Sequence, residues 1–374
     1  MDSNKLTEYL DSLTSDYVPS VDCIVYKEHK EIYRHMSGKV DFEHTVPVSN
    51  DTMYLMFSMT KVITMTSVLM LIEAGKLSLE DRVDKYLPAY KTLMVKEGDK
   101  VVPAKNPLLI KHLVSMQSGL DYDLNRPGIV RVLNKKGAAA TTQDIVNAFP
   151  ESPLMFHPGT HFLYSLSHDV CAAVVEVVSG MKFSEFLKKN IFEPLGMKRT
   201  FFAKPDNNLD NLADQYIFNE SAGKPEPMEK TCNYQLSECY ESGGAGLISC
   251  TEDYAVLADT LANGGISKDG VRILKAETVE LIKQNLLCEE GLKDISTLMG
   301  RVGYGYGIGM QVLMNRDLNK AAAPNGVFGW DGAAGSCIIM DTKSKTSLVY
   351  TMHVRGCGPA YGVIHPTLRD LVFG

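Results

Sequence analysis

Strand-like segments occur near both ends of this 374-residue chain, whereas helical patterns fill its middle. Residues 21–33 alternate around a polar turn, and residues 336–340 and 347–352 flank another, so each region predicts a β-hairpin. Helical stretches follow one another between about residues 108 and 190. Because strands from the two ends need partners, we expect a central antiparallel sheet built from both termini and flanked by helices.

The length of the chain and the order of these segments favour two units. We expect an α/β (α+β) sheet domain from residues 1–85 and 236–374. Residues 86–235 should form an inserted, mostly helical domain, with the active site between the two.

Two segments in this scheme have unusual composition. The passage from Asp206 to Cys232 contains Pro225 and Pro227 and predicts loops. Residues 304–312 alternate glycine with larger residues, which predicts a strand that other backbone approaches closely.

Composition excludes several kinds of partner. The net charge of −7 offers no basic surface for a phosphate backbone, which argues against nucleic acid. The N-terminus lacks a basic region followed by an apolar run, and the apolar stretch from Val62 to Ile72 is too short to cross a bilayer. We therefore expect a cytoplasmic protein without a membrane partner. The eight cysteines show no metal-ligand spacing, and nothing fixes the oligomeric state.

The segment from Ser58 to Ala74 is apolar nearly all round, which predicts a buried helix. Ser58 and Lys61 form a Ser-x-x-Lys motif whose two side chains share one face of that helix. The same spacing recurs at Ser179 and Ser221, but there it follows a helix end or falls in a loop. The alternative is a helix-capping serine with Lys61 reaching solvent.

A serine hydroxyl becomes a good nucleophile only when a base removes its proton. Lysine and tyrosine both titrate near pH 10, yet each can assist the other. A lysinium about 4 Å from a phenolate, at an effective dielectric of about 20, interacts with it by roughly 4 kcal/mol. That corresponds to about three pKa units, which brings a phenolate near neutral pH. The chain contains 17 tyrosines, and this argument does not choose among them.

Three segments occur in an order and spacing that resemble the serine β-lactamase-like superfamily: Ser58-Met59-Thr60-Lys61, Tyr164-Ser165-Leu166 and Trp330-Asp331-Gly332-Ala333. This superfamily includes class C β-lactamases, DD-peptidases and family VIII carboxylesterases. Segments between these motifs also resemble the superfamily, for example Met116-Gln117-Ser118-Gly119-Leu120 and His157-Pro158-Gly159-Thr160. The resemblance covers roughly residues 20 to 360 and implies a β-lactamase/DD-peptidase-like fold.

The resemblance assigns roles to individual residues. Ser58 would be the nucleophile and Lys61 its proton partner. Tyr164 would be the general base for acylation and the acid that protonates the leaving group. The N–H groups of Ser58 and Ala333 would form the oxyanion hole. No metal or cofactor is implied.

Departures from the family pattern narrow the substrate. In β-lactamases and DD-peptidases the residue two after the tyrosine is usually asparagine, but here it is Leu166. The third motif usually begins with a cation, but here it begins with Trp330, which either lines the acyl pocket with Gly332 or anchors the core. Losing both anchors disfavours β-lactams and D-Ala-D-Ala peptides. The pattern is most similar to family VIII carboxylesterases.

Four residues near these motifs are possible substrate contacts. Leu166 and Asp331 belong to the motifs themselves. His353 and Arg355, on the last predicted strand, would bind a substrate carboxylate or form a solvated strand end. Asp169 is interpreted as structural, bonding a nearby loop.

The sequence therefore predicts a serine hydrolase that forms an acyl-enzyme on Ser58 and acts on small esters. The alternatives are a β-lactamase or D-amino-acid peptidase, an acyltransferase, and a penicillin-binding sensor that acylates without turnover. In each case the partner is a small-molecule ester or amide.

Overall fold

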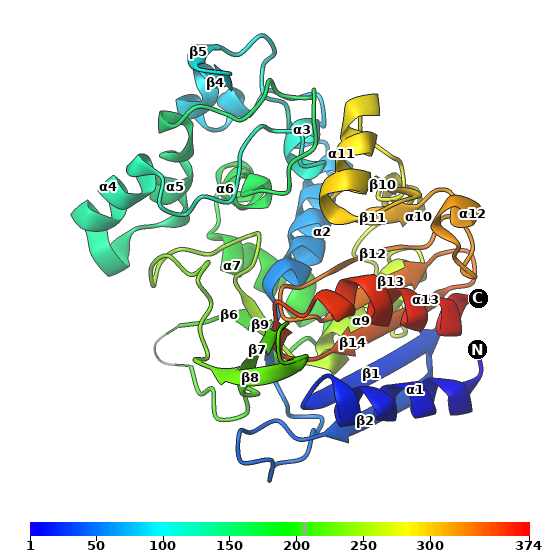
Figure 1. Cartoon of the computed structure of the whole chain (residues 1–374). Coiled ribbons are helices and arrows are strands. Elements are labelled where there is room, and N and C mark those ends of the chain that lie inside the picture. Colours follow the sequence, from blue (N-terminus) through cyan, green and yellow to red (C-terminus); the bar gives the residue numbers. More distant parts are fainter. Residues whose placement is uncertain (205–206) are drawn as a thin grey trace.

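The computed structural model describes residues 1–204 and 207–374, so Pro205 and Asp206 lie outside the described residues (Figure 1). Its centre is a seven-stranded antiparallel sheet in the order β10-β11-β12-β13-β14-β1-β2. The strands are β1 (Ser20–Lys27), β2 (Lys30–Gly38), β10 (Tyr304–Tyr306), β11 (Gln311–Leu313), β12 (Phe328–Asp331), β13 (Cys337–Asp341) and β14 (Thr346–Thr351). The predicted sheet built from both termini is confirmed.

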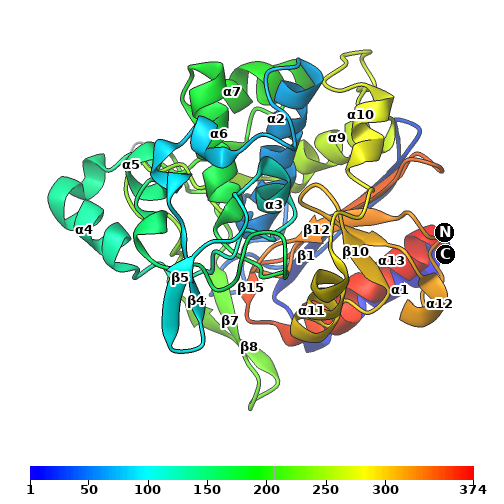
Figure 2. The same cartoon turned by 90° about the horizontal axis from the view of Figure 1, so that it is seen from above.

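Helices cover both faces of this sheet. Helix α1 (Ser3–Asp16) and helix α13 (His365–Phe373) lie side by side on one face, near both chain ends (Figures 1 and 2). On the other face, α9 (Thr251–Ala262) packs against β1, β13 and β14, and α2 (Thr60–Glu73) packs against β12.

Strand β1 shows how the sequence produces this layering. Cys23 and Val25 pack in the cluster that contains α1 and α13, whereas Ile24 belongs to the main core on the other face. Successive strand residues point to opposite faces, and both faces of β1 are buried. Because both faces are buried, the apolar residues 23–25 follow one another here without a polar residue between them.

A series of mostly short helices lies in the chain between β2 and β10. They are α3 (Ile110–Val114), α4 (Pro127–Lys136), α5 (Thr142–Val146), α6 (Ser167–Ser179), α7 (Phe183–Leu187) and α8 (Glu193–Leu195). Helix α6 contacts α2, α3, α5 and α7, which places it beside the Ser58 segment. The division at residues 86 and 235 stays a prediction.

Smaller elements complete the fold. They are β3 (Tyr54–Leu55), β4 (Met94–Glu97), β5 (Lys100–Pro103), β6 (Phe201–Phe202), β9 (Leu247–Ser249), α10 (Ala276–Leu281), α11 (Glu289–Met299), α12 (Arg316–Asn319) and β15 (Val354–Arg355). Among the described residues, no helix has the length and apolar composition needed to cross a membrane.

The predicted loop from Asp206 to Cys232 contains a hairpin over its described part. Strand β7 (Gln215–Asn219) pairs with β8 (Lys224–Met228), although β8 carries Pro225 and Pro227. The prediction failed because β8 is an edge strand, paired only with β7, and proline is tolerated where no ladder hydrogen bond is donated.

The predicted strand over residues 304–312 is also wrong in form. It is a tight hairpin between β10 and β11, and Gly309 in its turn has a φ of +70°. The expected close approach of backbone is present, because a β-carbon at Gly307 would lie 1.8 Å from the carbonyl oxygen of Ile282. Glycine at this position is a packing requirement.

Candidate active site

Ser58 lies in a short 3₁₀ turn, Phe57–Met59, between β3 and α2. The preceding residue, Phe57, has a φ of +46°, a left-handed conformation that is strained for a bulky residue. The turn packs closely against the third motif, because a β-carbon at Gly332 would lie 2.5 Å from the carbonyl oxygen of Met56. Ser58 is partly exposed, whereas both of its neighbours are buried.

Lys61, one turn further on, is fully buried. Its Nζ donates to Ser58 Oγ at 3.1 Å, to Tyr122 Oη at 2.7 Å and to the carbonyl oxygen of Gly244 at 2.7 Å. Three acceptors match the three protons of an ammonium group. The alternative of a capping serine with an exposed lysine is excluded.

Burial sets the protonation of Lys61. It lowers the pKa of the amine to about 7, while the negative charges of Asp169 and Asp331 act in the opposite direction. A substantial fraction of Lys61 is therefore unprotonated at neutral pH, and the free amine can accept a proton from Ser58.

Tyr164 joins the same cluster from the segment before α6. Its Oη accepts a hydrogen bond from Trp330 Nε1 at 3.0 Å, and Lys61 Nζ lies 4.6 Å from its ring centroid. Burial raises the pKa of the Tyr164 phenol, and hydrogen bonds with Ser58 and Trp330 only partly offset this rise. The electrostatics thus differ from the phenolate we expected. The lysine, not the tyrosine, is the group whose pKa lies near neutrality.

Trp330 has the core role that was one of the two considered for it, and its place in the acyl pocket stays a prediction. Its side chain is almost completely buried and packs edge-on against Tyr306, with ring centroids 5.0 Å apart. The same ring lies 5.4 Å from Tyr164. Trp330 therefore anchors the core and fixes the position of the Tyr164 hydroxyl.

Tyr122 is a site residue that the sequence did not single out. It accepts a hydrogen bond from Lys61, and its ring lies 5.4 Å from that of Tyr164 and 5.6 Å from that of Tyr234. It follows Ser118-Gly119-Leu120, a segment that the resemblance did include. Proximity to that segment was the available signal.

Asp169 holds the backbone that accepts from Lys61. One oxygen of its buried carboxylate accepts from Tyr240 Oη at 2.7 Å, from Ser242 Oγ at 2.6 Å and from Gly244 N at 3.4 Å. We call residues 239–244 the strap. The prediction that Asp169 bonds a nearby loop is confirmed.

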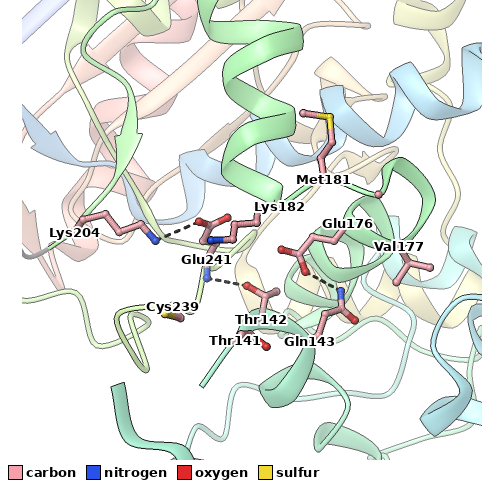
Figure 3. A pocket seen from close by; sticks show the side chains of 11 residues that line it. Thr141, Thr142, Gln143, Glu176, Val177, Met181, Lys182, Lys204, Cys239 and Glu241 are labelled. Carbon is pink, nitrogen blue, oxygen red and sulfur yellow. Dashed lines mark hydrogen bonds and ion pairs between the residues drawn. The ribbon is translucent and has the colours of Figure 1, made fainter. Parts of the chain in front are cut away.

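The strap has a second side, which faces a cavity of about 550 Å³ (Figure 3). Glu241 points to this cavity and pairs with Lys204 at 3.2 Å, and its N–H donates to Thr142 Oγ1 at 2.9 Å. The cavity lining includes neither Ser58 nor Lys61.

The third motif forms a turn at the end of β12, residues 332–335, which we call the oxyanion turn. Gly332 N donates to Ser336 O at 2.8 Å, and Val354 N donates to Ala334 O at 3.0 Å. The N–H of Ala333 meets no acceptor in the described part of the chain, and the residue is partly exposed. This N–H is available to a bound oxygen.

Two of the predicted substrate contacts, Leu166 and Asp331, make other contacts within the protein instead. Leu166 is buried in the main core. Asp331 is buried and forms an ion pair with Arg301. Although burial raises it, the pKa of the Asp331 carboxyl is held below its usual range by Arg301 and His365.

Of the two residues predicted to bind a substrate carboxylate, His353 and Arg355, only Arg355 is in a position to do so. His353 bonds backbone through both ring nitrogens, Nδ1 with Ala213 O at 3.0 Å and Nε2 with Leu55 N at 3.4 Å. Burial lowers its pKa to about 4, so it supplies no positive charge at neutral pH. Arg355 is partly exposed, and its guanidinium lies 5.3 Å from the ring centroid of Phe57.

Comparison with solved structures supports the fold. The structure of EstCE1, described as a hydrolase with promiscuous acyltransferase activity, superimposes with a TM-score of 0.81 at 26% identity. The match covers 99% of this chain and 98% of that chain.

Relatives with described activities align over most of the chain. Esterase EstB of Burkholderia gladioli is 24% identical over 366 residues, covering 94% of this chain and 89% of its own. Acyltransferase calJ of Penicillium decumbens is 28% identical over 332 residues, covering 81% and 76%. The family model described as Beta-lactamase matches residues 7–363. Because this family model matches nearly the whole chain, and the structure of EstCE1 shares the fold, the chain belongs to the beta-lactamase family.

Proposed function

We propose that the protein is a serine hydrolase that forms an acyl-enzyme on Ser58 and hydrolyses small carboxylic esters. One observation carries the proposal. The Lys61 amine, with a pKa of about 7, lies 3.1 Å from Ser58 Oγ in a site that burial has dehydrated. A serine beside a buried base is the arrangement that nucleophilic catalysis requires.

In the proposed mechanism, unprotonated Lys61 accepts the proton of Ser58 as Oγ attacks the ester carbonyl. The N–H groups of Ser58 and Ala333 stabilise the resulting oxyanion. Tyr164, which burial keeps protonated, donates its proton to the leaving alkoxide and regains one from Lys61. Water then attacks the acyl-enzyme, its proton passes to the same pair, and Ser58 leaves protonated.

The site favours esters over amides. Leu166 offers no hydrogen bond to a substrate amide, and Trp330 offers no positive charge to a substrate carboxylate. An alkoxide is a better leaving group than an amine and needs less anchoring. Arg355, which pairs with no carboxylate in the described chain, would favour esters with an anionic group on the acyl chain.

Transfer of the acyl group to an alcohol is the second candidate. The names of EstCE1 and calJ both refer to acyltransferase activity. The same acyl-enzyme serves both reactions, and only the acceptor differs. Adding an alcohol to the assay and measuring the new ester separates them.

Substrate class is tested by steady-state turnover of p-nitrophenyl butyrate beside a chromogenic cephalosporin. We expect rapid ester turnover, little cephalosporin turnover, and a loss of at least about 10⁴-fold in kcat for Ser58→Ala. Faster cephalosporin turnover would contradict the interpretation of Leu166 and Trp330. A single stoichiometric burst would identify a sensor, and an unaffected Ser58→Ala variant would refute the mechanism.

The pH profile tests the base. Since Lys61 must be unprotonated to accept a proton, we expect log kcat/KM for p-nitrophenyl butyrate to fall with unit slope as the pH drops below about 7. The free enzyme governs this parameter, so the inflection reports the unliganded site. A rate that stays constant down to pH 5 would show that the base is not Lys61.

Removing the hydroxyl oxygen of Tyr164 or of Tyr122 distinguishes the roles of these two tyrosines. Tyr164→Phe should reduce kcat by about 10²- to 10⁴-fold, because it removes the proton donor to the leaving group. Tyr122→Phe removes only an acceptor of Lys61 and should cost less than about tenfold, while lowering the pH of the acidic inflection. Equal losses of kcat in both variants, or a larger loss for Tyr122→Phe, would contradict the role of Tyr164 as the proton donor to the leaving group.

A further inference from the structure

Three tyrosine rings follow one another beside Ser58. Tyr122, Tyr164 and Tyr234 are each partly exposed, as Ser58 itself is, whereas the residues on either side of Ser58 are buried. The ring centroids of Tyr122 and Tyr164 are 5.4 Å apart, and those of Tyr122 and Tyr234 are 5.6 Å apart. A substrate bound at Ser58 therefore has aromatic side chains as its neighbours.

Tyr234 connects this row of rings to the oxyanion turn. Its ring lies edge-on to that of Phe57, the residue before Ser58, with centroids 6.3 Å apart. Tyr234 also packs on the apolar cluster that contains Phe57 and Ala334, as Ala333 does. The N–H of Ala333 is one of the two oxyanion donors in the proposed mechanism. The Tyr234 ring is thus placed beside both turns that would hold the reacting carbonyl.

The segment that carries Tyr234 is held in place by side chains. Residues 229–238, between β8 and the strap, contain no helix or strand. Cys232 Sγ donates to the carbonyl oxygen of Ala245 at 3.4 Å, and Gln235 Nε2 donates to the carbonyl oxygen of Ala203 at 2.8 Å. These bonds lie on both sides of Tyr234 in the chain. The position of the ring is therefore fixed before a substrate binds, which reduces the entropy that binding costs.

We infer that Tyr234 selects esters that carry an aromatic ring on the acyl chain. The inference rests on the proposed function, because it requires an acyl group on Ser58. Aromatic rings attract one another in offset and edge-to-face arrangements, beyond the effect of the area they bury. Burial raises the pKa of the Tyr234 phenol, although the positive charge of Arg355 opposes the rise, so the ring is uncharged at neutral pH.

The position of Tyr164 assigns the Tyr234 ring to the acyl side of the ester. Tyr164 donates a proton to the leaving group in the proposed mechanism, so the alcohol part must lie at the Tyr164 hydroxyl. Tyr122 contacts both other rings, but among the described residues no ring contact joins Tyr164 and Tyr234. Tyr234 instead contacts Phe57 and packs beside the oxyanion turn. An acyl chain that extends from Ser58 towards Tyr234 leaves the proton donor free for the alcohol.

Two matched substrates separate a preference for an aromatic ring from a preference for size. They are p-nitrophenyl 3-phenylpropanoate and p-nitrophenyl 3-cyclohexylpropanoate, which share a leaving group and differ only in their terminal ring. The cyclohexyl ring is the larger and more apolar of the two, so burial alone favours it. For the wild type we expect kcat/KM to be about three- to tenfold higher for the phenyl ester. Because the ring contact is made before and during the reaction, the difference should appear in KM.

Variants assign this preference to Tyr234. Tyr234→Leu keeps an apolar side chain but removes the ring, so the ratio of the two kcat/KM values should fall below about 1.5. Tyr234→Phe keeps the ring and should keep the ratio. The control is Tyr26→Leu, which removes another partly exposed tyrosine, in β1, and should leave the ratio unchanged. If circular dichroism showed that Tyr234→Leu does not fold, Tyr234→Ser would replace it.

Two results would overturn the inference and leave the proposed hydrolysis intact. One is wild-type turnover of both esters with equal kcat/KM, and the other is an unchanged ratio in Tyr234→Leu. If neither ester were hydrolysed, the proposed function would fail instead. Calorimetric dissociation constants for 3-phenylpropanoate and 3-cyclohexylpropanoate would then replace the rates, and equal affinities in the wild type would overturn the inference as well.

Discussion

The burial of one amino group, that of Lys61, governs the organisation of the site. An unpaired ammonium in an apolar interior costs several kcal/mol, so the structure must supply acceptors or lower the pKa of the amine. This protein does both. Ser58, Tyr122 and the Gly244 carbonyl surround the nitrogen, and burial brings its pKa to about 7. The same burial that disfavours the charge leaves Lys61 able to accept a proton near neutral pH.

Two supports outside the reacting groups keep this arrangement in place. Asp169 holds the strap, and the strap supplies the Gly244 carbonyl to Lys61. Arg301 holds Asp331, at the start of the oxyanion turn. Each support includes a buried carboxylate, Asp169 or Asp331, whose negative charge also raises the pKa of Lys61. The value of about 7 is thus a balance between burial, which dominates, and these two charges.

Much of this could be predicted from local pattern. The helix after Ser58 followed from an apolar run, and the hairpin of β13 and β14 followed from alternation around a polar turn. The association of Ser58, Lys61, Tyr164 and Trp330 followed from motifs that resemble a known superfamily. Each of these signals lies within a few consecutive residues.

The remainder depends on contacts between distant segments. Of the 17 tyrosines, Tyr122 accepts the hydrogen bond from Lys61, and the only local signal for it is its proximity to Ser118-Gly119-Leu120. The two prolines of β8 predict a loop when only the sequence is known. The order of the strands is needed to show that β8 lies at the edge of its sheet, where proline is tolerated. The charge states of Lys61 and Tyr164 depend on burial, which the sequence pattern did not provide. A pairwise estimate from Coulomb's law alone leaves out this burial, which lowers the pKa of Lys61 and raises that of Tyr164.

The central claim is that Ser58, and no other residue, is the nucleophile that this buried lysine activates. Its most direct test is covalent labelling with a fluorophosphonate at pH 8, followed by intact mass spectrometry and peptide mapping. We expect one adduct per chain, located on Ser58, with labelling abolished in Ser58→Ala and strongly slowed in a Lys61→Met variant that still folds. An adduct on another residue, or equal labelling of wild type and Ser58→Ala, would contradict the account.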